Sequence, residues 1–303
     1  MKQLLACLLV PFVVSPAFAQ KSNDVKITQG DHQLDIRIGD RPFAKFNYAH
    51  DLPKPFFLPV HAPDGTVITR ALDDPKDKDH KHHKGIWLSV DEINKVQFWA
   101  EKGKIANYSV KVTKAAGNPA QFVVKNNWMG TDGPIIAETT TVSVHSNGIL
   151  AYDITFTAVK DEVEFEDTKE GLFGFRMVSS MREKEGGKVV NSDGKKGTKE
   201  CWGQTAAWVD YYGQVDGKTC GLAIFDHPKN FRASRYHVLN YGLFSISPFG
   251  EKAYTGGKNQ AAPLHLKKGE TTRLRYAMYI HMDDTDKADV AGAYKKYLKS
   301  TAE

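Results

Sequence analysis

A tract rich in histidine offers the densest chemistry in this sequence. Residues 77–87 read Asp-Lys-Asp-His-Lys-His-His-Lys-Gly-Ile-Trp, which places His80, His82 and His83 within four positions. Imidazole exchanges protons near neutral pH and is a common metal ligand, so the tract suits acid–base catalysis or metal binding. In an extended segment, His80 and His82 would point to one side and His83 to the other. The alternative interpretation is a solvated charged loop.

A second polar cluster runs from Asp167 to Arg176 and surrounds the start of an expected strand. Its glycines allow a ligand to approach closely, and its charged side chains, which include Lys169 and Glu170, could orient a hydroxylated substrate. We expect Arg176 to share a strand face with Glu170 and keep it ionised, as suits a base. Close approach of Asp167 would instead raise the pKa of Glu170, as suits an acid. The alternative is a strand edge closed by ion pairs.

Aromatic residues accompany charged ones elsewhere in the chain. Segments 208–213 and 235–242 contain Asp210, His237 and Tyr241. Rings stack on the apolar face of a pyranose while polar groups bind its hydroxyls, so this mixture is typical of sugar sites. Trp87 belongs to the same class, and Arg70 is a candidate anchor for an anion or a sugar. The alternative is that the rings belong to the core of a β-sandwich.

The N-terminal segment has the pattern of a signal peptide. Lys2 precedes an apolar run from Leu4 to Val14, and Ala17-Phe18-Ala19 forms an A-x-A cleavage site. We expect cleavage after Ala19 and export to the periplasm or the medium. The alternative is a lipobox at residues 4–7, which would leave no apolar region before it.

Two cysteines, Cys201 and Cys220, remain in the expected mature chain. In an oxidising compartment they could form a disulfide, and two buried thiols are the equal alternative.

Composition excludes several classes of function. The 303 residues are 41% hydrophobic and 25% charged, which is typical of globular proteins. The net charge of +5 is spread over mixed signs, which argues against a dedicated nucleic-acid binder. After the signal peptide no apolar run is long enough for a membrane span. The sequence also lacks G-x-S-x-G, G-x-G-x-x-G, P-loop and H-E-x-x-H motifs.

Alternation of apolar and polar residues dominates the rest of the chain. Runs at 34–38, 140–144, 150–158 and 274–280 predict strands, and Asn147-Gly148 predicts a hairpin turn. Further short strands are expected near 108–113, 121–128, 171–179, 205–211 and 219–226. Apolar residues spaced from Val290 to Leu298 predict one helix, with N-caps at 283–285. The fold class is therefore all-β, a large antiparallel β-sandwich with few helices, one of them near the C-terminus, in a single domain over 20–303.

These clusters, in this order, resemble a bacterial family of unknown function that is found among polysaccharide-utilisation genes and labelled "methane oxygenase PmoA". The resemblance covers nearly the whole expected mature chain, from Lys54-Pro55-Phe56-Phe57 to Pro248-Phe249-Gly250. The label does not describe a function for this chain, because an oxygenase subunit in a membrane would need several apolar runs of about 20 residues.

A weaker resemblance is to galactose-mutarotase-like sandwiches, in which His83-Lys84-Gly85 is similar to a motif of aldose epimerases. The resemblance implies a sugar bound on a large sandwich, with His and Glu as acid and base. The sequence departs from those epimerases where Lys169 and Glu170 stand in place of a second histidine.

Three hypotheses follow. The first is an exported carbohydrate-active enzyme in which a carboxylate and an imidazole act on opposite sides of a sugar carbon, by hydrolysis, elimination or epimerisation. Its candidate catalytic residues are Glu170, His83, His82 and His237, and its candidate substrate-binding residues are Arg70, Asp167, Lys169, Arg176, Asp210, Tyr241 and Trp87. The second is a non-catalytic glycan-binding protein. The third is a protein that binds a divalent metal through His80, His82 and His237.

Overall fold

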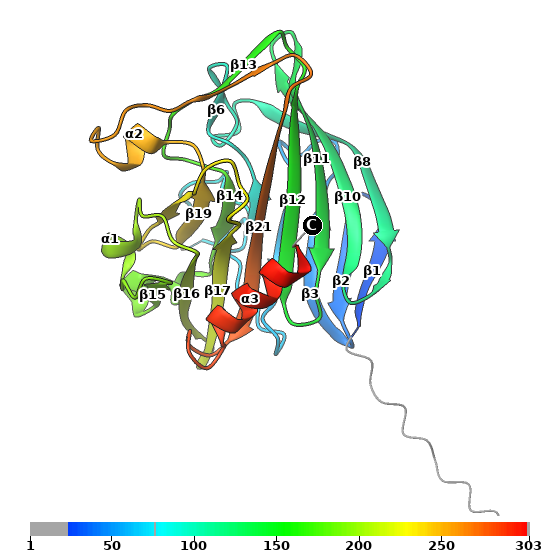
Figure 1. Ribbon diagram of the computed structural model, residues 1–303. Coiled ribbons are helices and arrows are strands. Elements are labelled where there is room, and N and C mark those ends of the chain that lie inside the picture. Colours follow the sequence, from blue (N-terminus) through cyan, green and yellow to red (C-terminus); the bar gives the residue numbers. More distant parts are fainter. Residues whose placement is uncertain (1–23, 76, 302–303) are drawn as a thin grey trace, which may run out of the picture.

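The computed structural model describes residues 24–75 and 77–301, and it confirms the expected all-β fold (Figure 1). Its sheets are antiparallel, and two large ones face each other across an apolar core. The expected signal peptide and its cleavage site lie outside the described residues. No helix among the described residues is long and apolar enough to cross a membrane.

The first large sheet, which we call sheet I, has nine strands within the described residues, in the order β18-β19-β14-β5-β4-β3-β2-β1-β9. Its strands are β1 (Val25–Gly30), β2 (Gln33–Ile38), β3 (Arg41–Asn47), β4 (Phe56–Val60), β5 (Ile86–Leu88), β9 (Ala116–Gly117), β14 (Phe173–Arg176), β18 (Arg235–Val238) and β19 (Leu243–Ser247).

The second large sheet, sheet II, has eight strands in the part of the chain that the structure describes, in the order β15-β16-β17-β21-β12-β11-β10-β8. Its strands are β8 (Lys104–Lys114), β10 (Ala120–Gly130), β11 (Gly133–Val144), β12 (Ile149–Ala158), β15 (Lys188–Asn191), β16 (Trp208–Val215), β17 (Lys218–Asp226) and β21 (Thr271–Met282).

Smaller elements join and flank the two sheets. A small sheet pairs β6 (Glu92–Ile93), β7 (Val96–Gln97), β13 (Glu162–Phe165) and β20 (Leu264–Lys267). The helices are α1 (Thr198–Cys201), α2 (Glu251–Tyr254) and α3 (Val290–Ser300), with 3-10 turns at Ser179–Met181 and Glu183–Glu185.

The core lies between the two sheets and is rich in aromatic rings. Phe57 and Phe173 of sheet I pack against Tyr152 of sheet II, with ring centroids 6.4 and 4.5 Å apart. In a strand, alternate residues point to opposite faces, so the neighbours of these core residues point outward from sheet I. The alternation seen in the sequence thus decides which side chains point away from the core and are available to form a site.

The strongest sequence patterns are confirmed. The hairpin around Asn147-Gly148 joins β11 to β12, and the runs at 34–38 and 274–280 lie in β2 and β21. The helix is confirmed as α3, which packs its apolar face on the outer face of sheet II. Its N-cap is Asp289, whose carboxylate accepts from the Gly292 amide, so the expected caps at 283–285 are wrong.

The two cysteines lie in separate elements as free, buried thiols. Of the two interpretations left open by the sequence, the structure therefore has the pair of buried thiols. Burial raises the pKa of each thiol to about 11, which makes both poor nucleophiles.

A buried ion pair holds the chain that leads into α3. His281 Nε2 lies 2.9 Å from Asp210 Oδ1, and the other Asp210 oxygen accepts from the Thr285 hydroxyl. Burial alone would lower the pKa of His281, but the Asp210 carboxylate outweighs it and raises that pKa.

This pair predicts that stability depends on pH. Because the folded pKa of His281 is raised, its contribution is complete below the unfolded pKa of about 6.5 and is lost as pH rises through the folded pKa. We expect the gap in unfolding free energy between wild type and His281→Gln to shrink between about pH 6 and about pH 9. Urea unfolding at both values measures this gap, and a constant gap would contradict the assignment.

Candidate functional site

Four neighbouring strands at one end of sheet I, from the edge strand β18 to β5, place a row of residues on its outer face. Trp87 of β5 lies opposite Gly174 of β14, Gly174 lies opposite Ser245 of β19, and Ser245 lies opposite His237 of β18. Their sequence neighbours fill the core on the other side of the sheet. The row therefore forms a floor, with an indole at one end and an imidazole at the other.

The glycine in this row has a steric reason. A Cβ at position 174 would lie 2.8 Å from the Trp87 ring and 3.0 Å from the ring of Trp99. Since real Cβ atoms essentially never approach so closely, a larger residue would displace both indoles. Gly174 thus allows the two tryptophans to pack over β14.

The histidine tract forms a turn and not an extended segment, so the alternation that an extended segment would give does not occur. The His83 amide donates to the His80 carbonyl at 2.9 Å, which closes the turn. As a result all three imidazoles gather, with His80 and His82 centroids at 4.8 and 4.4 Å from that of His83. Gly85 then leads into β5 with φ of 59°, and a Cβ there would lie 1.9 Å from the Phe57 carbonyl oxygen.

Four rings and a guanidinium form one stack above the floor. His83 is parallel to Trp87, with centroids 5.3 Å apart, and His80 is parallel to His83. Tyr241 follows His80 at 5.4 Å, and the Arg176 guanidinium lies 4.9 Å from the Tyr241 ring. Because each ring fixes the next, the stack restricts the orientation of every imidazole within it.

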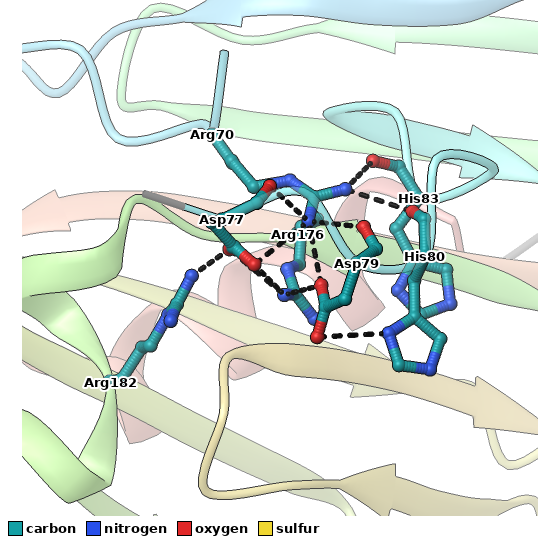
Figure 2. Close-up of polar contacts among 7 residues, drawn as sticks. All are labelled: Arg70, Asp77, Asp79, His80, His83, Arg176 and Arg182. Atoms are coloured by element: carbon teal, nitrogen blue, oxygen red, sulfur yellow. Dashed lines mark hydrogen bonds and ion pairs between the residues drawn. The ribbon is translucent and has the colours of Figure 1, made fainter. Parts of the chain in front are cut away.

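Buried charges anchor this tract to the sheet, as Figure 2 shows. Arg176 donates to Asp77 at 2.9 Å and to Asp79 at 2.7 Å, and Arg182 also pairs with Asp77. Arg70 bonds both carboxylates and donates to the carbonyls of Asp79, His80 and His83. These contacts make Arg70 and Arg176 anchors of the histidine tract, and a substrate-binding role for either stays a prediction.

A second charge cluster supports the other end of the stack. Lys54, whose side chain is only 1% exposed, donates to Glu101 at 2.7 Å and to the His82 carbonyl at 2.9 Å. Lys84 binds the same carboxylate, and burial lowers the pKa of Lys54 to about 8. The ammonium also lies 5.5 Å from the Trp87 ring.

The carboxylate of the site is paired with His237. Glu170 Oε2 lies 3.9 Å from His237 Nε2, and the Glu170 side chain is 30% exposed. Burial and then the Asp91 carboxylate raise the pKa of Glu170, while Lys169 partly offsets them. The expected ionising effect of Arg176 is wrong, because the Arg176 guanidinium pairs with Asp77 and Asp79 and the pKa of Glu170 is raised. A raised pKa favours the acid of the two roles that the sequence left open, and the role itself stays a prediction.

The imidazoles of His82, His83 and His237 are uncharged near neutral pH. Burial lowers the pKa of His237 and His82 to about 4, and it lowers that of His83 well below its usual range. Arg70, Arg176, Arg182, Lys54 and Lys84 each contact a carboxylate of the protein. The imidazoles and stacked rings between them suit a ligand that carries hydroxyl groups.

Other sequence candidates take structural roles or lie elsewhere. Asp167 accepts from the backbone amides of Lys252, Ala253 and Ala262, so it holds α2 and the following loop. Lys169 is exposed beside Glu170. Asp210 lies on the outer face of sheet II with His281, away from the other candidates, because its neighbours in β16 face the core.

Sequence reasoning missed three residues of the site. Asp91 lies close enough to Glu170 to raise its pKa, and Trp202 and Tyr254 pack edge-on against His237 at 6.1 and 6.0 Å. These residues come from loops and a short helix that are distant in sequence. A pattern within one segment could not have indicated them.

Several buried polar atoms of this floor and of the stack above it have no hydrogen-bond partner in the described structure. They are His83 Nδ1, Trp87 Nε1, Arg176 Nε and Nη1, His237 Nδ1 and Ser245 Oγ. An unsatisfied buried polar group costs about 1–3 kcal/mol, so their concentration on one face indicates a functional surface. Among the described residues, no group of three or more His, Cys, Asp or Glu side chains is arranged to hold a metal ion.

The buried charge cluster leads to a prediction on stability. Arg176→Met would remove the fully buried one of the two guanidinium groups that Asp77 and Asp79 share, so we expect a loss of about 3–5 kcal/mol in unfolding free energy. The control is Arg273→Met, which breaks the exposed pair of Arg273 with Asp153 and should cost about 1 kcal/mol or less. Urea unfolding measures both, and equal losses would contradict an anchoring role for Arg176.

Comparison with solved structures gives similarity at low sequence identity. The Slr1438 protein from Synechocystis sp. PCC 6803 is 9% identical with a TM-score of 0.43, covering 86% of this chain and 96% of that chain. Galactose 1-epimerase from Lactobacillus acidophilus NCFM is 7% identical with a TM-score of 0.40, covering 86% and 99%. Heparan sulfate lyase HepC from Pedobacter heparinus is 8% identical with a TM-score of 0.40, covering 87% of this chain and 36% of the lyase. The expected resemblance to sugar epimerases is one of fold alone.

No curated protein gives a significant match to the chain. One family model does match, over residues 33–295, and its description names no activity. The resemblance to the PmoA-labelled family stays a prediction. With the match covering most of its length, the chain belongs to DUF6807, a family of unknown function.

Proposed function

We propose that this protein is an exported carbohydrate-active enzyme that performs acid–base chemistry on a neutral sugar. The observation that carries the proposal is the Glu170–His237 pair, 3.9 Å apart, at the edge of a floor of buried and unpartnered polar atoms. Aromatic rings surround the pair, which suits the mixed apolar and polar surface of a pyranose. The neutral imidazoles of His82, His83 and His237 can exchange hydrogen bonds with the hydroxyls of a neutral sugar.

Each member of the pair has a protonation state that suits one role. Glu170, with its raised pKa, can hold a proton and donate it to a sugar oxygen. His237, with a pKa of about 4, is neutral and can accept a proton through Nε2. The partner of Glu170 is therefore His237 and not His83, which is stacked on Trp87.

The short separation bears on the type of reaction. Hydrolysis by two carboxyl groups requires them about 5–9.5 Å apart on either side of the glycosidic bond. Two groups 3.9 Å apart reach neighbouring atoms on one side of a sugar ring, in place of the opposite sides expected from sequence. Proton transfer of this kind suits isomerisation or elimination.

The proposal predicts the effect of Glu170→Gln. The amide keeps the shape of the side chain but cannot donate or accept the proton, so turnover should fall by about 10²–10⁴-fold while binding changes little. A library of neutral mono- and oligosaccharides, screened by calorimetry and by NMR of the products, provides the substrate. The control is Glu162→Gln in β13, which changes an exposed glutamate. Wild-type turnover in Glu170→Gln would exclude the acid, and sugar binding without any turnover in the wild type would indicate a glycan-binding protein.

The two protonation states also predict a pH profile. His237 must be neutral, so activity should fall as pH drops through about 4. Glu170 must be protonated, so activity should fall again as pH rises through its raised pKa. The alkaline limb of kcat/KM should disappear in Glu170→Gln, and an unchanged limb would assign it to another group.

Export is part of the proposal and has its own test. Cleavage after Ala19 would give a mature chain that begins at Gln20. N-terminal sequencing of protein recovered from the periplasm or the medium checks this. A chain that retains Met1, or one that begins at Cys7, would contradict it.

A further inference from the structure

His80 is a surface side chain that is held unusually firmly. Its side chain is 42% exposed, yet its ring lies between the parallel rings of His83 and Tyr241. Its backbone has φ of 43°, a left-handed conformation that costs a non-glycine residue about 1 kcal/mol or more. Arg70 fixes the same residue by donating to its carbonyl at 2.9 Å.

The carboxylate of Asp79 orients the imidazole. His80 Nδ1 lies 3.1 Å from Asp79 Oδ2, and the other Asp79 oxygen accepts from Arg70 and Arg176 (Figure 2). With two guanidinium groups holding Asp79, the proton of a neutral His80 belongs on Nδ1. Nε2 then carries a lone pair and can accept a hydrogen bond.

The position of His80 places this lone pair beside the site that contains Glu170. Burial and then the nearby Glu170 carboxylate raise the pKa of Tyr241, which stacks on His80, to about 12. His82 also faces His80, with ring centroids 5.7 Å apart. His80 thus lies on the rim of the same site that holds Glu170.

A second histidine in the chain shows what His80 would be without this support. His32 also follows an aspartate, has φ of 50° and is 43% exposed. Its Asp31 is 97% exposed and lies 3.5 Å from Nε2 rather than Nδ1. The pair of residues therefore provides a matched control within one molecule.

We infer that His80 binds the substrate: Asp79 holds its Nδ1 proton, and Nε2 accepts a hydrogen bond from a sugar hydroxyl at the rim of the site. The role of the hydroxyl rests on the proposed function, whereas the orientation of the ring does not. His80 is then a determinant of which sugar binds, through one hydroxyl that must be present and correctly placed.

The orientation is tested by NMR of protein with ¹⁵N-labelled histidine, through long-range proton–nitrogen correlations. We expect His80 in the Nδ1–H form and His32 mainly in the Nε2–H form that free histidine favours. The signals are assigned from spectra of His80→Phe and His32→Phe. An Nε2–H form for His80, or a mixture like that of His32, would overturn the inference.

The contact is tested with the sugar found in the screen described above. His80→Phe keeps a ring between His83 and Tyr241 but removes the acceptor, so binding should weaken about tenfold, which corresponds to one hydrogen bond. His80→Gln offers an amide oxygen and should recover part of the loss, and His32→Phe should bind like the wild type. Removal of the matching hydroxyl from the sugar should weaken the wild type as much as His80→Phe does, and should not weaken that variant further.

These outcomes separate this inference from the proposed function. If no neutral sugar binds, the proposed function fails, and the tautomer of His80 still decides whether Asp79 orients the ring. If sugars bind and Glu170→Gln abolishes turnover, but His80→Phe binds normally, the proposed function stands and the contact is wrong. Thermal unfolding of His80→Phe establishes that the variant is folded. If it does not fold, the comparison of His80→Gln with wild type and the sugar lacking the hydroxyl provides the same test.

Discussion

The buried contact between Arg176 and the carboxylates of Asp77 and Asp79 is the interaction on which the site depends. It joins the last residue of β14 to a tract almost a hundred positions earlier in the sequence. A guanidinium that is fully buried needs such partners, because an uncompensated buried charge is costly. The partners in turn are fixed by Arg70 and Arg182, so the turn that contains the histidines is held from several sides. Without these contacts the tract would be the solvated loop that its composition suggests.

The two faces of sheet I have different roles, one in the core and one in the candidate site. Residues of β5, β14, β18 and β19 that point inward build the aromatic core, while their neighbours point outward and build the floor of the site. In sheet II the outward-pointing residues include apolar ones, and these pack against the apolar face of α3. In Figure 1, α3 lies across β12 and β21 at a distance from β14 and β19. One outer face is thus closed by a helix, and the other is lined with polar groups.

Most charged side chains of the site form ion pairs with their neighbours. The arginines pair with Asp77 and Asp79, Lys54 and Lys84 pair with Glu101, and burial keeps His82, His83 and His237 neutral. Glu170 does not belong to these pairs, and burial and then Asp91 raise its pKa. Pairing the structural charges with each other leaves a carboxyl group and an imidazole whose protonation states differ from their usual ones, and such perturbed groups concentrate at functional sites.

The sequence by itself determined the fold class and several of the residues on the working face. Strict alternation around Leu34 and Tyr152 can be satisfied only by half-buried strands, and Asn147-Gly148 fixes a tight hairpin. The same local patterns brought attention to His83, Glu170, Arg176 and His237. The sequence could not show which of these residues lie together, because that depends on contacts between residues distant in the chain.

The tertiary structure alone decided that Arg70 and Arg176 bind aspartates, that Asp210 lies on the outer face of sheet II, and that Asp91 raises the pKa of Glu170. Periodicity is a property of one segment, whereas a site is a property of how segments pack, and only packing sets the distances on which charge and proton transfer depend.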